Sequence, residues 1–231
     1  MSDATERLSA SIVLVGKFNP AIFHPAWIAR TGLVSDAELE EAQLSVSHSE
    51  ISIFKVGGYA FDVRQDRFAV QVESEPLIRA LDATMLIFEE ALPHTPVTQI
   101  GINYVEHFRL SSADKRVRFG RALAPLAPWG RWGEKIAALS GEEASGVAEL
   151  TMQETYQDGS GHMRVEVQPS AIIEPKAVGV FVYVNDHRNV SASDNEEGAS
   201  AAMAMLRDCF DHSLNQARSI VAELTEFAQA A

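Results

Sequence analysis

Residues 95–110 read TPVTQIGINYVEHFRL, and this stretch decides how the fold is interpreted. Its even-numbered positions are apolar except for one carboxylate: Ile100, Ile102, Tyr104, Glu106, Phe108 and Leu110. Alternation with a period of two residues is typical of a β-strand that buries one face. The stretch therefore predicts a long strand, and Glu106 is the single exception on its buried side.

The residues before this strand begin with an apolar run at 11–18 that predicts a buried strand. Asn19 followed by proline indicates a helix start, because proline lacks the N–H that a first helical turn leaves unbonded. Pro25 interrupts the helix expected over 20–30, so two short turns explain the segment equally well. Ser35 with a glutamate three residues later predicts a capped short helix after it.

Alternating apolar residues over 43–73 predict further strands, with a hairpin at the Gly57-Gly58 pair. The alternation shifts between His48 and Ile51, which indicates a bulge or an additional turn. Residues 75–92 place their apolar side chains on one stripe and predict a helix. Up to this point the chain has the order β-α-β-β-β-α.

The strand at 95–110 begins the same order again. Residues 112–139 are helical or irregular, because several prolines and glycines break them. A turn-rich tetrapeptide joins 146–156 to 162–168 as a hairpin, and 178–184 is apolar on both faces, as in a central strand. The clearest helix is expected over 196–228, where apolar residues recur every three or four positions.

These elements predict an α+β fold, a largely antiparallel sheet with two long helices on one face. We expect a single globular domain over 1–231 with two pseudo-repeats, 10–94 and 95–231. Duplication of a β-α-β-β-β-α unit explains the repeated order, and so does coincidence in a large α+β protein. Both explanations stay open, because the two halves share no detectable residue identity.

Composition narrows the classes of function. A net charge of −13 argues against general coating of nucleic acid, since phosphates repel an acidic surface. The one cysteine, Cys209, excludes an intrachain disulfide. The sequence has no export signal and no apolar run long enough to span a bilayer, so we expect a cytoplasmic protein without membrane contact.

Common catalytic motifs are absent. The sequence has no glycine-rich phosphate loop, no HExxH, no paired CxxC and no G-x-S-x-G. We therefore expect no cofactor and no metal, and we assign no catalytic residue beyond weak candidates. These candidates are Glu106 and Glu154, which both interrupt the apolar side of a predicted strand. Two carboxylates on a buried face would raise each other's pKa and serve as acid and base or hold a cation. Alternatively, they lie beyond the covering helix or are turned outward by a bulge.

A basic and aromatic segment at 109–135 holds seven of the 19 lysines and arginines. Guanidinium groups bind phosphates or carboxylates, and indoles stack on bases or bury at interfaces. The segment therefore suits an anionic ligand, a single-stranded nucleic acid or an acidic partner surface. Alternatively, it is a solvated amphipathic helix whose arginines pair with the 32 acidic residues of the chain. The candidate binding residues are Arg109, Arg116, Arg118, Arg121, Trp129, Arg131 and Trp132.

A third group is Asp186-His187-Arg188 with Asp194, Asp208 and His212. A metal site would need three of these side chains to converge, so a surface ion pair and an exposed turn are the preferred interpretation.

Taken together, the sequence favours a non-enzymatic intracellular binding or assembly protein that acts through 109–135. We expect its partner to be a second copy or another protein. One alternative is an enzyme or small-ligand receptor with Glu106 and Glu154 in a cavity between sheet and helices. A further alternative is binding of single-stranded nucleic acid.

Overall fold

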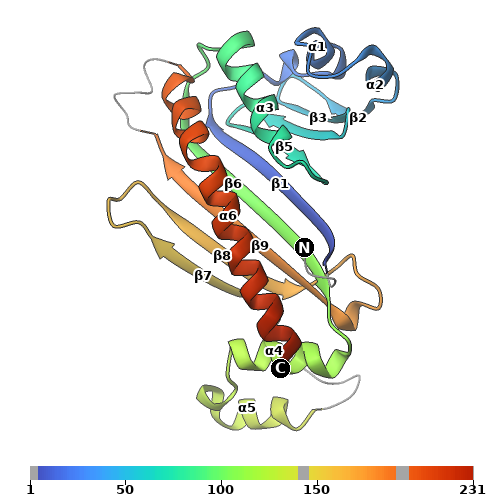
Figure 1. Ribbon diagram of the computed structural model, residues 1–231, viewed down its shortest axis with the longest axis vertical. Helices are drawn as coiled ribbons and strands as arrows, with labels where there is room; N and C mark the ends of the chain where they lie inside the picture. Colours follow the sequence, from blue (N-terminus) through green and yellow to red (C-terminus); the bar gives the residue numbers. More distant parts are fainter. Residues whose placement is uncertain (1–4, 140–145, 191–197, 231) are drawn as a thin grey trace.

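The computed structural model describes residues 5–139, 146–190 and 198–230, and within these ranges it has one nine-stranded sheet (Figure 1). Every paired strand is antiparallel to its neighbours. The strand order across the sheet is β2-β3-β4-β5-β1-β6-β9-β8-β7. The strands are β1 (Thr5–Gly16), β2 (Gln43–Ser47), β3 (Ile51–Val56), β4 (Tyr59–Arg64), β5 (Arg67–Val72), β6 (Val97–Arg109), β7 (Leu150–Thr155), β8 (Gly161–Pro169) and β9 (Gly179–Asn189). The predicted α+β class and antiparallel sheet are confirmed.

Helical segments connect the strands and cover the sheet. The α-helices are α1 (Pro25–Arg30), α2 (Asp36–Glu40), α3 (Arg79–Met85), α4 (Ala113–Leu123), α5 (Gly130–Ala137) and α6 (Ser200–Ala230). The 3-10 helices are η1 (Pro20–Ile22), η3 (Ala127–Trp129) and η5 (Lys176–Val178), and η2 (Leu86–Ala91) is a π-helix. None of the helices in the described ranges combines the length and the apolar character that crossing a bilayer requires.

Strands β1 and β6 form the centre of the sheet. β6 pairs with β1 on one side and with β9 on the other, so that Glu106 lies between Leu8 and Val182. β1 begins at Thr5, before the apolar run at 11–18, because its polar first half pairs with the far half of the long β6. β9 is an interior strand, as its apolar sequence predicts.

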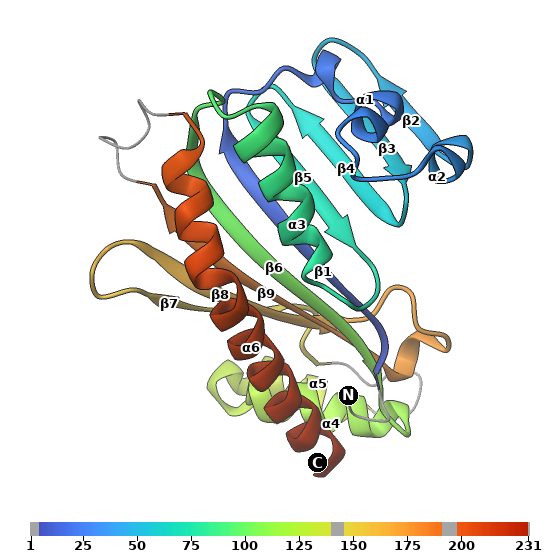
Figure 2. The ribbon, with the colours of Figure 1, turned by 45° about the horizontal axis from the view of Figure 1, so that its top comes forward.

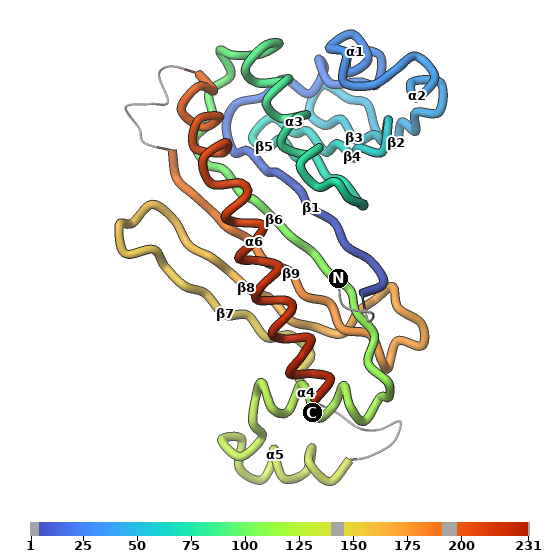
Figure 3. The backbone as a smooth tube through the Cα atoms, viewed as in Figure 1, coloured from blue at the N-terminus to red at the C-terminus, as the bar shows by residue number. Residues whose placement is uncertain are grey.

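One long helix covers the sheet. α6 has 31 residues, or about 46 Å at 1.5 Å per residue. It crosses β6 and β9 and contacts η2 near one end and α4 near the other (Figure 3). The segment predicted as the second long helix is divided between α3 and the π-helical η2. Figure 2 shows α3 and α6 on the same face of the sheet.

Local signals explain several short elements. The Asn19 side chain accepts a hydrogen bond from the backbone N–H of Ala21 at 3.2 Å, and the chain then forms η1 and α1 on either side of the break before Pro25. Ser35 forms a complete capping box at α2. The glycine pair between β3 and β4 takes positive φ values of 58° and 78°, which is why glycine is needed there.

The opposite face of the sheet is left open by α6 and α3. At its centre, Asn103 is only 5% exposed. Its amide donates to the Ser11 hydroxyl at 3.0 Å and accepts from Tyr183 at 2.8 Å and from Asn185 at 2.6 Å. Polar side chains that bond to one another therefore shield the middle of this face.

Candidate functional site

Glu106 is a buried carboxylate on the helix-covered face of β6. It is 8% exposed, and its Oε2 accepts a hydrogen bond from the Tyr104 hydroxyl at 2.7 Å. Its Oε1 accepts from the hydroxyl of Thr5 on β1. Burial, together with the bond to Glu106, raises the pKa of Tyr104. The exception in the apolar pattern is thus a carboxylate held inside the fold by two hydroxyl donors.

A cavity of about 460 Å³ adjoins this carboxylate, between the central strands and the second half of α6. The helix contributes residues at spacings of four and three, which places them on one face. The segment that precedes α3 closes one side. The lining residues are Leu8, Glu75, Tyr104, Glu106, Arg218, Ala222 and Thr225.

An ion pair forms the rim of the cavity. Arg218 Nη2 donates to Glu75 Oε1 at 2.6 Å, and both side chains are more than 40% exposed. The other oxygen of Glu75 accepts from the backbone N–H of Leu77 at 3.0 Å, which fixes the carboxylate in place. An ion pair this open to water adds little stability, so its main effect is to balance charge at the entrance.

Thr225 is the least expected residue of the cavity wall. It is 3% exposed, and its hydroxyl has no hydrogen-bond partner among the described residues. Sequence reasoning missed it, although the signal was present, because it is a polar residue between Val221 and Ala228 on the apolar stripe of α6. Buried polar atoms are nearly always bonded, so a lone hydroxyl beside a cavity is unusual.

Glu154 lies in different surroundings from Glu106. It is exposed on β7 and lines a separate, mostly apolar cavity of about 580 Å³ with residues such as Met152 and Phe227. Glu106 pairs with Val182 on β9, Val182 pairs with Val167 on β8, and Val167 pairs with Leu150 on β7, three strands from β6. Glu154 lies four residues beyond Leu150 along β7. These offsets put about 20 Å between the two carboxylates, too far for one to set the ionisation of the other. The structure therefore does not bring the pair together.

Most basic side chains of the 109–135 segment bond within the protein. Arg118 also has an interaction partner. The bonds run from Arg109 to Glu6, from Lys115 to the Gln229 carbonyl, from Arg116 to the Ala177 carbonyl at 2.6 Å, and from Arg121 to the Ile136 and Leu139 carbonyls at 3.0 and 3.4 Å. These contacts tie α4 to its neighbours along the chain and in space.

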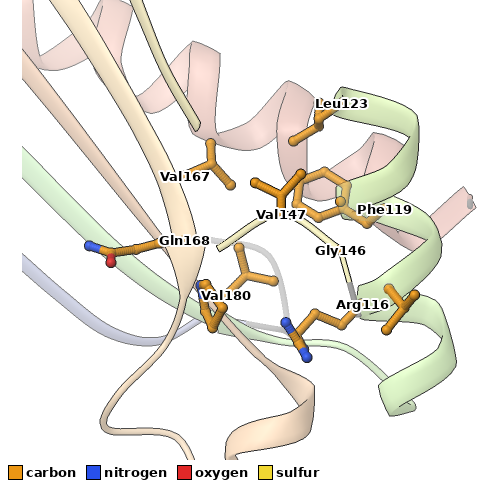
Figure 4. Close-up of a pocket in the computed structure, with 11 residues that line it drawn as sticks. Arg116, Phe119, Leu123, Gly146, Val147, Val167, Gln168 and Val180 are labelled. Atoms are coloured by element: carbon orange, nitrogen blue, oxygen red, sulfur yellow. The ribbon is translucent and has the colours of Figure 1, made fainter. Parts of the chain in front are cut away.

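Arg116 also borders a small gap of about 30 Å³ between α4 and the strands β8 and β9 (Figure 4). Phe119, Val147 and Val167 point toward one another there, while Gln168 points away. Burial lowers the pKa of Arg116. The gap is too small for a ligand larger than water, so this part of the segment is a packing junction.

Trp129 and Trp132 are exposed aromatic residues of the segment. They are 58% and 57% exposed, and their rings meet edge to face with centroids 5.3 Å apart. Gly130, with a φ of +53°, turns the chain from η3 into α5 between them. Arg131 and Lys135 lie on α5, as Trp132 does. We call these four side chains, Trp129, Arg131, Trp132 and Lys135, the tryptophan surface.

Asp186 and Arg188 lie in strand β9 as an ion pair with a buried carboxylate, and not in the exposed turn expected from the sequence. Asp186 is 2% exposed and lies 3.0 Å from Arg188, and it also accepts from Tyr156 at 2.9 Å and from Ser213. Bonding, and not solvent, therefore satisfies this carboxylate.

The remaining members of that predicted group do not join it. Asp208 and His212 are exposed on α6, and Asp194 lies outside the described residues. His187 lies on the open face of the sheet, stacked on His162 with centroids 4.8 Å apart. In the part of the chain that the structure covers, no three histidine, cysteine or acidic side chains gather as a metal site would require.

Comparison with known proteins gives no family. No family model matches the chain, and no curated protein is significantly similar to it.

Proposed function

We propose that the protein is a non-enzymatic binding protein whose tryptophan surface docks on an acidic surface of a partner protein. The observation that supports this proposal is the pair of exposed indoles that meet where η3 turns into α5. Keeping two large rings in water costs free energy in proportion to their apolar area, and burial against a partner recovers it. Tryptophan and arginine are also the residues that contribute most to binding at interfaces.

The chemistry of the segment favours protein over nucleic acid. Arg109, Lys115 and Arg116 are bonded to groups of the fold itself, so they are poorly placed to follow a phosphate backbone. The net charge of −13 adds a long-range repulsion. Arg131 and Lys135 on α5 outnumber its one carboxylate, Glu134, so this helix has a net positive charge that suits a limited acidic patch. Single-stranded nucleic acid is the weaker proposal.

The test compares two double variants as baits in a nuclease-treated native lysate. Trp129→Ala/Trp132→Ala removes the indoles, and Leu44→Ala/Val46→Ala removes exposed apolar side chains from β2 at the far edge of the sheet. We expect an acidic protein that the wild type and the β2 variant retain and the tryptophan variant loses. With that protein purified, affinity should fall roughly tenfold or more in the tryptophan variant, a loss of about 1.4 kcal/mol.

Intrinsic fluorescence gives an independent readout, because two of the three tryptophans lie on this surface. The wild-type spectrum should shift to shorter wavelength on binding. Retention of the same proteins by all three baits would contradict the proposal. Loss of binding after nuclease treatment alone would favour nucleic acid.

We also infer that the chain arose by duplication of a β-α-β-β-β-α unit, as the repeated element order suggests. The arrangement on either side of the β1–β6 pair supports this inference. On one side β5, β4 and β3 follow β1, and on the other β9, β8 and β7 follow β6, while β2 is an additional strand at the edge of the first half. Each set of strands is followed in the chain by a helix on the same face, α3 or α6.

A further inference from the structure

We propose that the cavity beside Glu106 binds a small organic monocation, a protonated amine with a short alkyl chain. The site is separate from the tryptophan surface and does not depend on it.

The charges around the cavity favour a cation. Arg218 and Glu75 pair with each other at the rim, so their charges cancel. Glu106 lies deeper, and its bonds to other described side chains are to hydroxyl groups, those of Tyr104 and Thr5. A buried carboxylate is stabilised far better by an opposite charge than by neutral donors. An ammonium group in the cavity would supply that charge.

The hydrogen-bonding groups of the cavity wall also favour a cation. The Tyr104 hydroxyl uses its only proton on Glu106, so its oxygen can only accept from a ligand. The Glu106 carboxylate can only accept as well. The inner wall therefore presents acceptors, and an ammonium group brings three donors.

The remaining wall fits a short apolar chain. Leu8 on β1, the register partner of Glu106, and Ala222 on α6 are the apolar members of the lining. A volume of about 460 Å³ lies within the usual range for small-molecule sites. A divalent metal fits less well, because only Glu75 and Glu106 offer carboxylates and Glu75 is already bonded to Arg218 and to Leu77.

Three isosteric probes test the charge of the ligand: n-butylamine, 1-butanol and butyrate, with calcium as a fourth arm. Binding is followed by calorimetry and by NMR shifts of the α6 amides on the full chain. We expect saturable binding of butylamine at millimolar concentration, with the largest shifts near Ala222 and Thr225. Butanol, butyrate and calcium should not compete. Binding of butanol as tight as that of butylamine, or displacement of the amine by calcium, would overturn the proposal.

Variants locate the site. Glu106→Gln keeps the shape and an acceptor for Tyr104 but removes the charge, and it should weaken butylamine binding roughly tenfold or more. Glu154→Gln, the matched change in the neighbouring cavity, should leave binding unchanged. Tyr104→Phe provides a second test if Glu106→Gln folds poorly, and it should also weaken binding because it removes the hydroxyl acceptor of the cavity wall.

The two proposals fail separately. The Trp129→Ala/Trp132→Ala variant should bind butylamine like the wild type. Unchanged affinity in both Glu106→Gln and Tyr104→Phe, or no saturable binding to the wild type, would refute the amine site while leaving the docking proposal standing.

Discussion

Thr225 and Thr84 are both buried threonines on helices, and they differ in the state of the hydroxyl. Thr84, on α3, donates to the Ala80 carbonyl at 2.8 Å, whereas no partner is found for Thr225 within the described ranges. An unbonded buried hydroxyl has lost its hydration without compensation. The same substitution at the two positions should therefore have opposite effects on stability.

We predict that Thr225→Val raises the free energy of unfolding by about 1 kcal/mol, because it replaces an unbonded hydroxyl with a methyl group of similar size. Thr84→Val should lower it by a similar amount, since it removes a bond that is made. Urea unfolding followed by circular dichroism measures both. If Thr225→Val destabilises as much as Thr84→Val does, the Thr225 hydroxyl has a partner in solution.

Residue patterns predict which face of a strand a side chain occupies but not what covers that face. The alternation that singles out Glu106 singles out Glu154 for the same reason. Glu106 is buried because α6 crosses β6, and Glu154 is exposed because β7 is an edge strand. No local signal distinguishes the two positions. The cavity is also lined by Glu75 and Arg218, which are 143 positions apart in the sequence. No sequence pattern indicates that the two side chains form an ion pair.

At the scale of elements, β8 and β9 bring His162 and His187 together on the open face of the sheet. Burial, followed by the nearby charge of His162, lowers the pKa of His187. The unfolded chain then binds a proton more readily than the folded one. The stability that neutral His187 contributes is fully present above a pH of about 6.5, which is the pKa of histidine in the unfolded chain. It is lost as the pH falls through the pKa of His187 in the folded protein.

We predict that the protein loses stability between pH 7 and 5, and that His187→Gln makes this loss smaller. His48→Gln, in the exposed turn between β2 and β3, serves as the control and should keep the wild-type slope. Thermal unfolding across this pH range measures the effect. Equal slopes in all three proteins would show that His187 does not contribute.

Element types follow from the sequence more readily than element ends. Caps and turns are local, so the Ser35 box and the glycine hairpin are confirmed. The start of β1 and the end of β9 lie outside the predicted runs, because a strand extends as far as its neighbour offers hydrogen bonds. The break of the second helix into α3 and η2 was likewise not predicted.

At the scale of the whole molecule, β2 and β7 are the two edges of the sheet, and neither pairs with a further strand in the described part of the chain. β7 also carries Met152, which is 68% exposed above the apolar cavity that Phe227 lines. Unprotected edges next to apolar surface favour pairing with another chain. The expectation of a homo-oligomer therefore stays a prediction, with β7 as the edge that pairs.

We predict a dimer through β7, with twice the chain mass of 25.2 kDa in light scattering at micromolar concentration. Met152→Lys should shift it to the monomer, because it places charge on the apolar edge. Leu44→Lys, the same kind of change on β2, should not. A monomeric wild type, or equal effects of both substitutions, would contradict the prediction.

The position of α6 in the chain has a consequence for synthesis. This helix follows all nine strands, so the ribosome completes the apolar face of the sheet before it makes the helix that covers the middle of it. Until residues 200–230 have emerged, the growing chain exposes Ile102, Phe108 and Val182 to its surroundings. Chaperones that recognise such sequences have their longest opportunity on this protein just before translation reaches the helix.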